Sequence, residues 1–439
     1  MGPAPDLDST LQRLETFGVR LGLETTRRLL KALGEPQKSL RPVLVAGTNG
    51  KGSTAALLAS MVTMAGYKTG LYTSPHLESV EERIRIDGRS IATHRLAETV
   101  ATVVEVAEKA LGYLPTYFEA LTSAAFRIFA EESVDLAVLE VGLGGRLDAT
   151  NGVEPELSLI TEIGLEHQEY LGESLSSIAR EKAGILRSGR RAIAWVQRSE
   201  ARHAIQEVAD ELQADLVWGP ELVTIEQTND LGWSGQQIEM RTPGAGYEVN
   251  LPLVGTHQKG NLALAILAAE ALVDLGLDRL TTAAIAQGAA STRWPGRLEW
   301  IALPRAKPVL LDVAHNPDGA ETLKRSLEQR GGRYVLLFGA LADKQVREVL
   351  PVLADGAAAV ILTRPESERA LAPESLAPLV PGDSVLIEDD RTAALTTALE
   401  VPADFLVVSG SIYLVGNVRV MLRERFGVPL PATEPTIAG

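Results

Sequence analysis

The chain has 439 residues, which suggests two or three domains, and 45% of them are hydrophobic, enough to build substantial cores. Its 57 acidic and 42 basic residues give a net charge of −15, which argues against general nucleic-acid binding. No cysteine is present, so disulfides, thiolate zinc sites and cysteine nucleophiles are excluded.

The N-terminal residues lack the basic and apolar runs of a signal peptide. The longest apolar helix candidate, 262–273, is too short to span a bilayer and contains Glu270. We therefore expect a cytoplasmic protein with no membrane partner and no nucleic-acid partner.

In the first half of the chain, apolar runs of strand length alternate with segments of helical period. This alternation is typical of parallel βαβ units. The predicted strands are 42–46, 69–73, 135–140, 157–161 and 192–196, and the predicted helices are 52–65, 95–111, 119–131 and 174–186.

The pattern changes after residue 214. Short alternating runs with turn signals predict a small antiparallel section over 215–252, and a helical pair follows at 257–290. Pro295 and Gly296 break the helical pattern, so 291–297 is predicted to link two α/β domains, 1–290 and 298–439. Strands of the second domain are expected at 308–313, 334–338, 358–363, 384–388 and 404–409, and a Pro-rich tail follows residue 427.

The first predicted strand runs into a glycine-rich loop, V-L-V-A-G-T-N-G-K-G-S at 43–53. Such loops between a strand and a helix bind phosphate through backbone N–H groups, with lysine adding a positive charge. The usual pattern is G-x-x-x-x-G-K-[ST], and this loop departs from it at Val45 and Gly52. An ordinary strand-to-helix turn is the alternative, but the glycines, Lys51 and Ser53 together favour a phosphate site.

Three later residues are candidates for the same site. Glu140 ends a strong apolar strand, so it is predicted at the carboxyl edge of the sheet beside the phosphate loop, although a solvated strand end remains an alternative. His167 lies between two acids in a glycine-bounded loop. Lys182 lies near the end of a helix that Ser174 is predicted to cap, where its spacing alone indicates an interaction with the helix dipole.

Six segments occur in the order found in one family: G-T-N-G-K-G-S, T-S-P-H-L at 73–77, Y-F-E at 117–119, L-E-V-G-L-G-G-R-L-D-A-T-N at 139–151, E-K-A-G-I at 181–185 and L-D-V-A-H-N-P at 311–317. From about residue 10 to 425 the chain resembles the folylpolyglutamate synthases. These enzymes are often bifunctional with dihydrofolate synthase and belong to the Mur-type ATP-dependent amide ligases.

The resemblance implies a phosphate-loop, Mur-ligase-type central domain and a smaller Rossmann-like C-terminal domain. It also implies a reaction in which ATP converts a substrate carboxylate to an acyl phosphate and L-glutamate attacks it. The acceptor is dihydropteroate or a reduced folate, and the bifunctional enzyme is expected, with a polyglutamate synthase alone as the alternative.

Residue roles follow from the same resemblance. The ATP phosphates are expected on Gly50, Lys51, Gly52 and Ser53, and further ATP contacts on Asn261, Arg297 and Asp312. One Mg²⁺ is expected on Ser53, Ser74 and Glu140, and a second on Glu140, His167 and Lys182, with the lysine carried as a carbamate; a monovalent cation is a further candidate. The pterin is expected on Thr116, Tyr117, Phe118, Glu119, Leu147, Asp148 and Ala149, and the glutamate on His315 and Ser411.

Two positions depart from the family pattern: Glu166, where members often have Asp, and Tyr413, in a variable segment. The remaining alternatives are a phosphate-loop kinase or NTPase, a cell-wall Mur ligase and a nucleotide-binding module without catalysis. The kinase or NTPase alternative would leave the predicted second domain without a role. Only 46 residues precede Gly47, which we expect to be too few for the additional N-terminal domain of the cell-wall enzymes. We expect a monomer whose partners are its small-molecule substrates.

Overall fold

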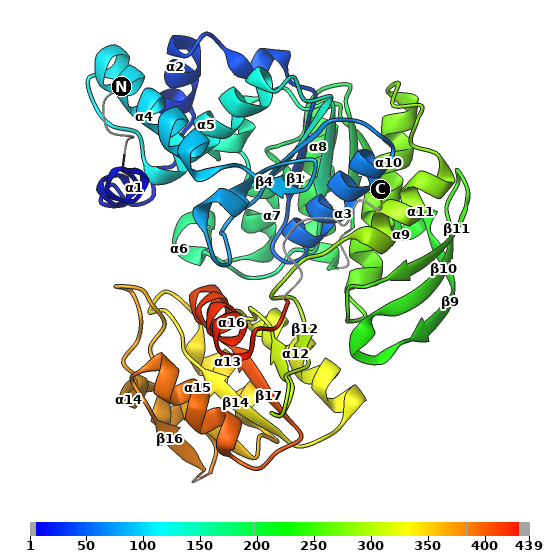
Figure 1. Ribbon diagram of the computed structural model, residues 1–439. Coiled ribbons are helices and arrows are strands. Elements are labelled where there is room, and N and C mark those ends of the chain that lie inside the picture. Colours follow the sequence, from blue (N-terminus) through cyan, green and yellow to red (C-terminus); the bar gives the residue numbers. More distant parts are fainter. Residues whose placement is uncertain (1–5, 196–197, 383, 430–439) are drawn as a thin grey trace.

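The computed structural model describes residues 6–195, 198–382 and 384–429. Figure 1 shows two bodies, with the N-terminal two thirds of the chain above and the C-terminal third below. Position 196 of the predicted strand 192–196 and most of the Pro-rich tail lie outside the described residues. Within the described part of the chain, no helix has both the length and the apolar character needed to cross a membrane.

The larger body is built on a mixed sheet whose described strands run parallel to one another, except for the two at one edge, 84–86 and 89–90, which pair antiparallel. In spatial order its described strands are β4 (Arg89–Ser90), β3 (Ile84–Ile86), β2 (Thr69–Tyr72), β5 (Leu136–Glu140), β1 (Pro42–Ala46), β6 (Leu157–Ile160), β7 (Arg191–Ala194) and β8 (Asp215–Trp218).

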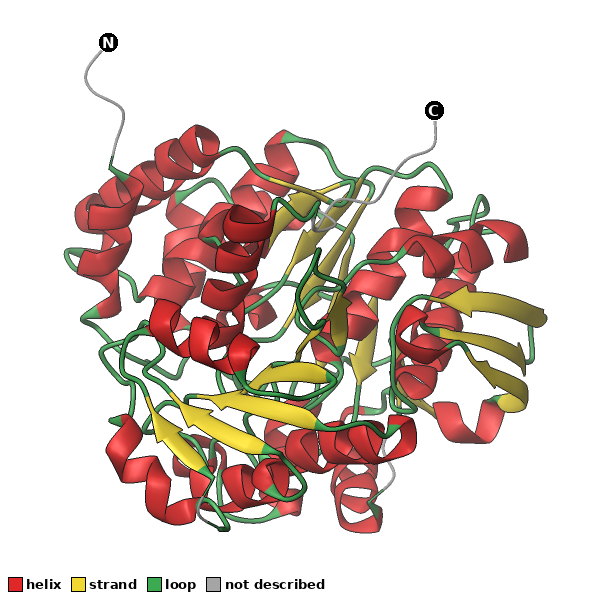
Figure 2. Cartoon of the chain, turned by 60° about the horizontal axis from the view of Figure 1, so that its bottom comes forward, coloured by secondary structure: helices red, strands yellow, loops and turns green. Residues whose placement is uncertain are grey.

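Helices cover both faces of this sheet (Figure 2). Since successive residues of a strand point to opposite faces, Leu44 joins one buried apolar cluster while Val43 and Val45 join another. The first cluster packs under α1 (Leu7–Glu15), α2 (Glu24–Ala32), α4 (Thr93–Leu111), α5 (Tyr117–Glu131), α7 (Leu175–Ala183) and α8 (Ser199–Leu212), and the second under α3 (Lys51–Met64), α10 (Gln258–Asp274) and α11 (Thr282–Ser291).

The section predicted as antiparallel, 215–252, is only partly so. Residues 224–251 form a three-stranded antiparallel sheet of β9 (Thr224–Asp230), β10 (Gln236–Arg241) and β11 (Gly246–Leu251). Residues 215–218 instead form β8 and pair in parallel with β7, because the crossover through α8 returns the chain to the edge of the larger sheet. Short helical turns complete this body: η1 (Pro36–Ser39), η2 (Val80–Arg83), η3 (Ala149–Gly152), α6 (Gln168–Leu171), α9 (Gly219–Leu222) and η4 (Gly232–Ser234).

The smaller body has a sheet that is parallel except at β12, an edge strand that the sequence pattern did not predict. In spatial order the described strands are β12 (Glu299–Ile301), β13 (Val309–Leu311), β17 (Phe405–Ser409), β14 (Tyr334–Phe338), β15 (Ala359–Leu362) and β16 (Val385–Ile387). One face packs on α12 (Pro317–Arg330), α13 (Val346–Ala354), α14 (Pro373–Leu376) and η5 (Ala377–Leu379), and the other on α15 (Arg391–Glu400) and α16 (Ile412–Phe426).

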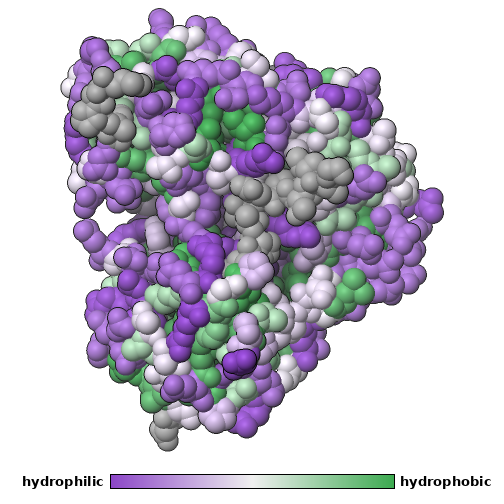
Figure 3. Space-filling view, in the orientation of Figure 1, coloured by the Kyte–Doolittle hydropathy of each residue, from purple (hydrophilic) through white to green (hydrophobic). Residues whose placement is uncertain are grey.

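The loops that leave the carboxyl ends of both parallel sheets line one cavity of about 860 Å³. Gly50 follows β1 and Gly142 follows β5 in the larger body, while Asp312 follows β13 and Ser411 follows β17 in the smaller one. Figure 3 shows the surface hollowed between the two bodies at the left of the view. Carboxyl edges of parallel strands are where open α/β sheets bind ligands, so the fold places the candidate site between the domains.

Candidate active site

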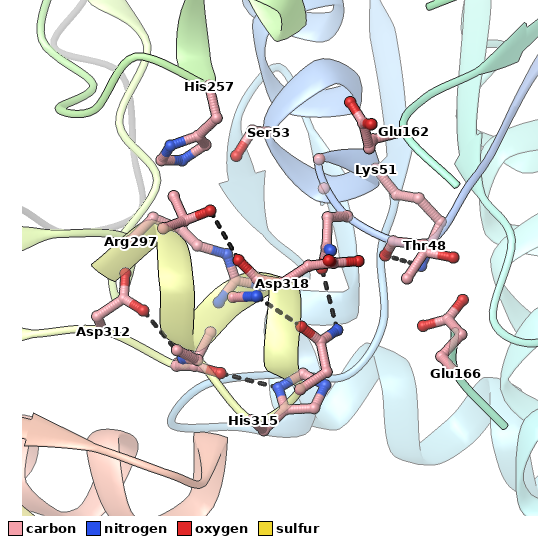
Figure 4. A pocket seen from close by; sticks show the side chains of 18 of the residues that line it. Thr48, Lys51, Ser53, Glu162, Glu166, His257, Arg297, Asp312, His315 and Asp318 are labelled. Atoms are coloured by element: carbon pink, nitrogen blue, oxygen red, sulfur yellow. Dashed lines mark hydrogen bonds between the residues drawn. The ribbon is translucent and has the colours of Figure 1, made fainter. Parts of the chain in front are cut away.

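The glycine-rich loop leads from β1 into the N-terminus of α3, as predicted. Gly47 has a φ of 146°, and a Cβ there would lie 1.8 Å from Thr161 Oγ1; Gly50 caps the helix in the left-handed region at φ 90°. Both positions therefore require glycine. Lys51 Nζ donates to the carbonyl oxygens of Gly47 and Thr48 at 3.0 Å, which folds its side chain back over the loop (Figure 4).

Two side chains from outside the loop fit against its glycines. A Cβ on Gly50 would lie 2.3 Å from Asn261 Oδ1, and one on Gly52 would lie 2.9 Å from the ring of Trp294. Asn261 also donates to Gln258 Oε1 at 2.8 Å, and Gln258 lies 3.4 Å from Ser53 Oγ. The start of α10 thus packs against the phosphate loop, and the ATP contact expected of Asn261 stays a prediction.

Glu140 lies at the carboxyl end of β5, in register with Val45 of the neighbouring β1, as predicted. Its carboxylate is buried and accepts the backbone N–H of Ser74 at 3.1 Å. Burial raises the pKa of Glu140, and the charges of Lys51 and Arg297 partly oppose the shift. Removal from water disfavours the carboxylate form, so this group is suited to a cation.

Lys182 is 1% exposed and lies on the last turn of α7, whose Ser174 cap was also predicted. Its Nζ donates to Gly47 O and to Glu166 Oε1, each at 2.6 Å. Burial lowers the pKa of Lys182, while Glu166 works in the opposite direction. For Glu166, burial raises the pKa, but the positive charges of Lys182 and Lys51 outweigh burial and hold the pKa of Glu166 below its usual range.

His167 follows Glu166 and lines the cavity. Its φ of 46° puts a non-glycine residue in the left-handed region, a conformation that costs free energy and is held by the surrounding structure. Burial lowers the pKa of His167, which favours the neutral ring. A neutral imidazole is the form that binds metal ions.

The smaller body contributes the opposite wall. Asp312 accepts the backbone N–H groups of Leu298 and Ala314 at 2.9 Å, which ties the residue directly after the linker to the end of β13. His315 Nδ1 donates to Val313 O at 2.8 Å, so Nε2 is the acceptor nitrogen of the neutral ring, and burial lowers the pKa of His315 to about 4. Ser411 caps α16 and lines the cavity.

Two contacts across the cleft were not predicted. Asn316 caps α12, and its Nδ2 donates to Asn49 Oδ1 of the phosphate loop at 3.1 Å. Arg198 pairs with Asp318 at 2.8 Å. The Asn-Pro pair at the start of α12 is a helix-cap signal that could have identified Asn316 from the sequence.

Most of the predicted site residues line this cavity, and the others are not among its described lining residues. Those in the described lining are Gly50, Lys51, Gly52, Ser53, Ser74, Glu140, His167, Asn261, Arg297, Asp312, His315 and Ser411. Lys182 and the predicted pterin residues, Thr116, Tyr117, Phe118, Glu119, Leu147, Asp148 and Ala149, are not in this lining.

The predicted pterin residues have structural partners of their own. Thr116 and Glu119 form a capping box at the start of α5. Asp148 accepts from Leu143 N and from Thr150 N and Oγ1, at 2.5 to 3.0 Å, so much of its hydrogen-bonding capacity is used within its loop. The ring of Phe118 packs behind Gly142, where a Cβ would lie 2.5 Å from it.

Among the described residues, no group of three or more histidine and carboxylate side chains stands ready to hold a metal ion. The donors present are nonetheless of the right kind. Ser53, Ser74, Glu140 and His167 all line the cavity near the phosphate loop, and the hydroxyl and carboxylate oxygens suit Mg²⁺, which takes its remaining ligands from water and phosphate. The buried carboxylate of Glu140 supports this fit.

Two α/β domains that line one cavity around a phosphate loop are the architecture of the Mur ligase class. The Mur ligase middle domain model matches residues 45–269, and the Mur ligase glutamate ligase domain model matches 296–412. The dihydrofolate synthase/folylpolyglutamate synthase of Bacillus subtilis is 35% identical over 416 residues, which is 93% of this chain and 96% of that protein.

Solved structures agree over nearly the whole chain. One described as Escherichia coli FolC in complex with DHPP and ADP has a TM-score of 0.85 and 32% identity and covers 96% of this chain and 99% of its own. A bifunctional folylpolyglutamate synthase/dihydrofolate synthase with Mn, AMPPNP and L-glutamate bound has a TM-score of 0.83 and 30% identity, with coverages of 96% and 98%. The chain belongs to the folylpolyglutamate synthase/dihydrofolate synthase family, and the predicted resemblance and fold class are confirmed.

Proposed function

We propose that the protein is a bifunctional ATP-dependent ligase that adds L-glutamate to dihydropteroate and to the γ-carboxylate of reduced folates. One observation carries the proposal. The phosphate loop and Glu140 of one domain face Asp312, His315 and Ser411 of the other across a single cavity of about 860 Å³. A ligase needs such a site because nucleotide, acid and amine must meet away from water.

The reaction has two steps. A carboxylate oxygen of the acceptor takes the γ-phosphoryl group of ATP, which gives an acyl phosphate and ADP. The amine of L-glutamate then attacks the acyl carbon, loses a proton and displaces inorganic phosphate as the amide forms. Both steps gather negative charge on oxygen, so fixed cations and N–H donors lower the barrier.

The chain's residues divide these tasks between the domains. Lys51 and the N–H groups at the start of α3 would hold the β- and γ-phosphates, and Asn261, Arg297 and Asp312 would hold the rest of the nucleotide. His315 and Ser411 are proposed for the incoming glutamate. The segments 116–119 and 147–149 are proposed for the pterin, with Phe118 offering an aromatic face and Asp148 its remaining hydrogen-bonding capacity.

We propose two divalent-ion positions, one on Ser53, Ser74 and Glu140 and one on Glu140, His167 and a carbamate of Lys182. Such an ion neutralises phosphate charge and orients the transferring group. The carbamate forms when the Lys182 amine adds to CO₂ and releases a proton, and it would replace the ammonium–Glu166 pair with an oxygen ligand. A monovalent cation, a monomeric state and a cytoplasmic location complete the proposal.

The deciding experiment supplies the purified protein with Mg-ATP, L-glutamate and either dihydropteroate or tetrahydrofolate. We expect dihydrofolate from the first acceptor and glutamate-elongated tetrahydrofolate from the second, both identified by mass. Elongation alone would identify a folylpolyglutamate synthase without the dihydropteroate activity. Phosphate release from ATP with neither product would contradict the proposal and favour an NTPase.

A further inference from the structure

Helix α16 carries one buried arginine that connects both domains. The side chain of Arg419 is 3% exposed. Its Nε donates to both carboxylate oxygens of Glu299 at 3.0 Å, and its Nη1 donates to Glu78 Oε1. Glu78 comes from the larger body and Glu299 from β12 of the smaller one, so a single guanidinium bridges the domain boundary away from the phosphate loop.

The Glu299 side of this network reaches the linker. The Glu299 carboxylate also accepts the backbone N–H of Gly296 at 2.9 Å. Gly296 directly precedes Arg297, which lines the cavity and is proposed to contact ATP. Any shift of Arg419 therefore acts on the linker through one shared carboxylate.

The Glu78 side reaches the proposed metal site. Glu78 belongs to the loop 74–79, whose backbone N–H groups at 77, 78 and 79 donate to the Glu82 carboxylate at 3.0 to 3.1 Å. These bonds make the loop stiff, and its first residue, Ser74, donates to Glu140 at 3.1 Å. A displacement of Glu78 would therefore also displace Ser74, which lines the cavity.

The same loop lies directly against α16. A Cβ on Gly416 would lie 1.9 Å from Leu77 O, so only glycine allows this approach. Arg423, one turn beyond Arg419, donates to Glu78 Oε2 at 2.7 Å. The N-terminus of the helix, capped by Ser411, opens into the cavity. Helix α16 therefore extends from Ser411, at the proposed glutamate site, to Arg419 and Arg423, which bind Glu78 of the loop 74–79.

We infer that Arg419 is a positioning residue that holds the loop 74–79 and the linker at 296–297 against α16. It thereby keeps Ser74, Arg297 and Ser411 in one arrangement as nucleotide and glutamate bind. The inference rests on the proposed function for the roles of those three residues. Among the described residues, Arg419 and Arg423 face the carboxylates of Glu78 and Glu299. A largely buried ion network of this kind depends strongly on every partner being present.

The test replaces Arg419 by methionine, which keeps much of the side-chain volume and removes the charge and the donors. We expect kcat for glutamate addition to fall at least tenfold and the KM for ATP to rise at least threefold, measured on the fraction that binds nucleotide. R425M is the matched control, because Arg425 lies on the same helix and donates to Thr396 within its own domain. This control is expected to stay within twofold of the wild type.

Hydrogen exchange separates positioning from a purely structural role. In R419M we expect faster exchange at 74–79 and 296–298, with the central strands of both sheets protected as in the wild type. Because R419M removes the arginine from Glu299 and leaves Glu78 with Arg423 alone, it can fail to fold. E78Q then carries the test, with the same direction of change and a smaller size. R419K is expected to recover part of the activity.

Wild-type kcat and KM values in a folded R419M or E78Q protein would overturn the inference, as would uniform loss of protection without a change in KM. A wild-type enzyme that forms neither folate product contradicts the proposed function instead. The two failures remain distinguishable because the exchange of 74–79 and the binding of nucleotide are measured without turnover.

Discussion

Lys51 and Lys182 donate to the same backbone oxygen. Their ammonium groups lie 3.0 and 2.6 Å from Gly47 O, although the two lysines come from helices on opposite faces of the sheet. Two like charges on one carbonyl repel, and Glu166 offsets this by pairing with Lys182. The proposed carbamate on Lys182 would remove one of these two positive charges from the phosphate loop.

Replacing Lys51 by alanine tests the phosphate loop. The variant loses a positive charge from the proposed position of the β- and γ-phosphates, so we expect a rate at least a hundredfold lower, about 3 kcal/mol, with the fold intact. Phosphate release is the measurement. K109A, which removes one partner of a surface ion pair with Glu105, is the control. Turnover near that of the wild type in a folded K51A protein would contradict the assignment.

A carbamate on Lys182 makes activity depend on CO₂. We expect the rate to fall when CO₂ and bicarbonate are removed and to recover when they are returned. Enzyme equilibrated with ¹³C-bicarbonate should show one carbamate carbon signal by NMR, and K182A should lack it. Full activity without bicarbonate, together with an absent signal, is the result that excludes the carbamate.

Arg297 is predicted to contact ATP from the linker. R297A should raise the KM for ATP and reduce the compaction that ATP causes in small-angle scattering, since the linker then loses its charge at the nucleotide. The neighbouring Arg293 is exposed and donates to carbonyls of its own segment, which makes R293A a matched control. Equal ATP kinetics in the two variants would show that Arg297 is structural.

Phe118 is predicted to affect the two acceptors unequally. Dihydropteroate is the smaller acceptor and depends more on its pterin contacts, so F118A should lower its kcat/KM more than that of tetrahydrofolate. Both values are obtained from product mass in parallel reactions. Equal losses for the two acceptors would argue against a pterin role for 116–119 and for a packing role behind Gly142.

Glu162 gives a pH-dependent stability. Burial raises the pKa of this cleft carboxyl from 4.5 to about 7; Arg198 opposes the shift and Asp318 adds to it. Between these two pH values the folded state binds more protons than the unfolded state, so rising pH costs stability. We expect E162Q to melt at a higher temperature than the wild type at about pH 8, with the difference shrinking towards about pH 5.

The control for this prediction is E169Q, which changes an exposed glutamate nearby. Thermal unfolding without ligands, followed by circular dichroism across the pH range, is the measurement. A constant difference between E162Q and the wild type at all pH values would show that the carboxyl of Glu162 titrates in the folded and unfolded states alike.

The sequence by itself determined the local elements that lead into the site. Glycines at 47 and 50 allow backbone conformations and close approaches that other residues do not, so the loop after β1 is recognisable from its residues alone. Glu140 could be placed because the apolar run that leads to it is typical of a buried strand, and parallel strands present their carboxyl ends together. The order of the six motifs was enough to indicate the family.

Only the tertiary structure decided what these elements meet. Glu78 and Arg419 are 341 positions apart, and Asn49 and Asn316 are 267 apart. The sequence pattern also assigned 215–218 to the wrong sheet, because edge pairing depends on where a crossover helix returns the chain. Local patterns show which side of a helix or strand is apolar. An ion pair between domains depends instead on how the two domains pack against each other. That packing is determined by the sum of many contacts between residues far apart in the sequence.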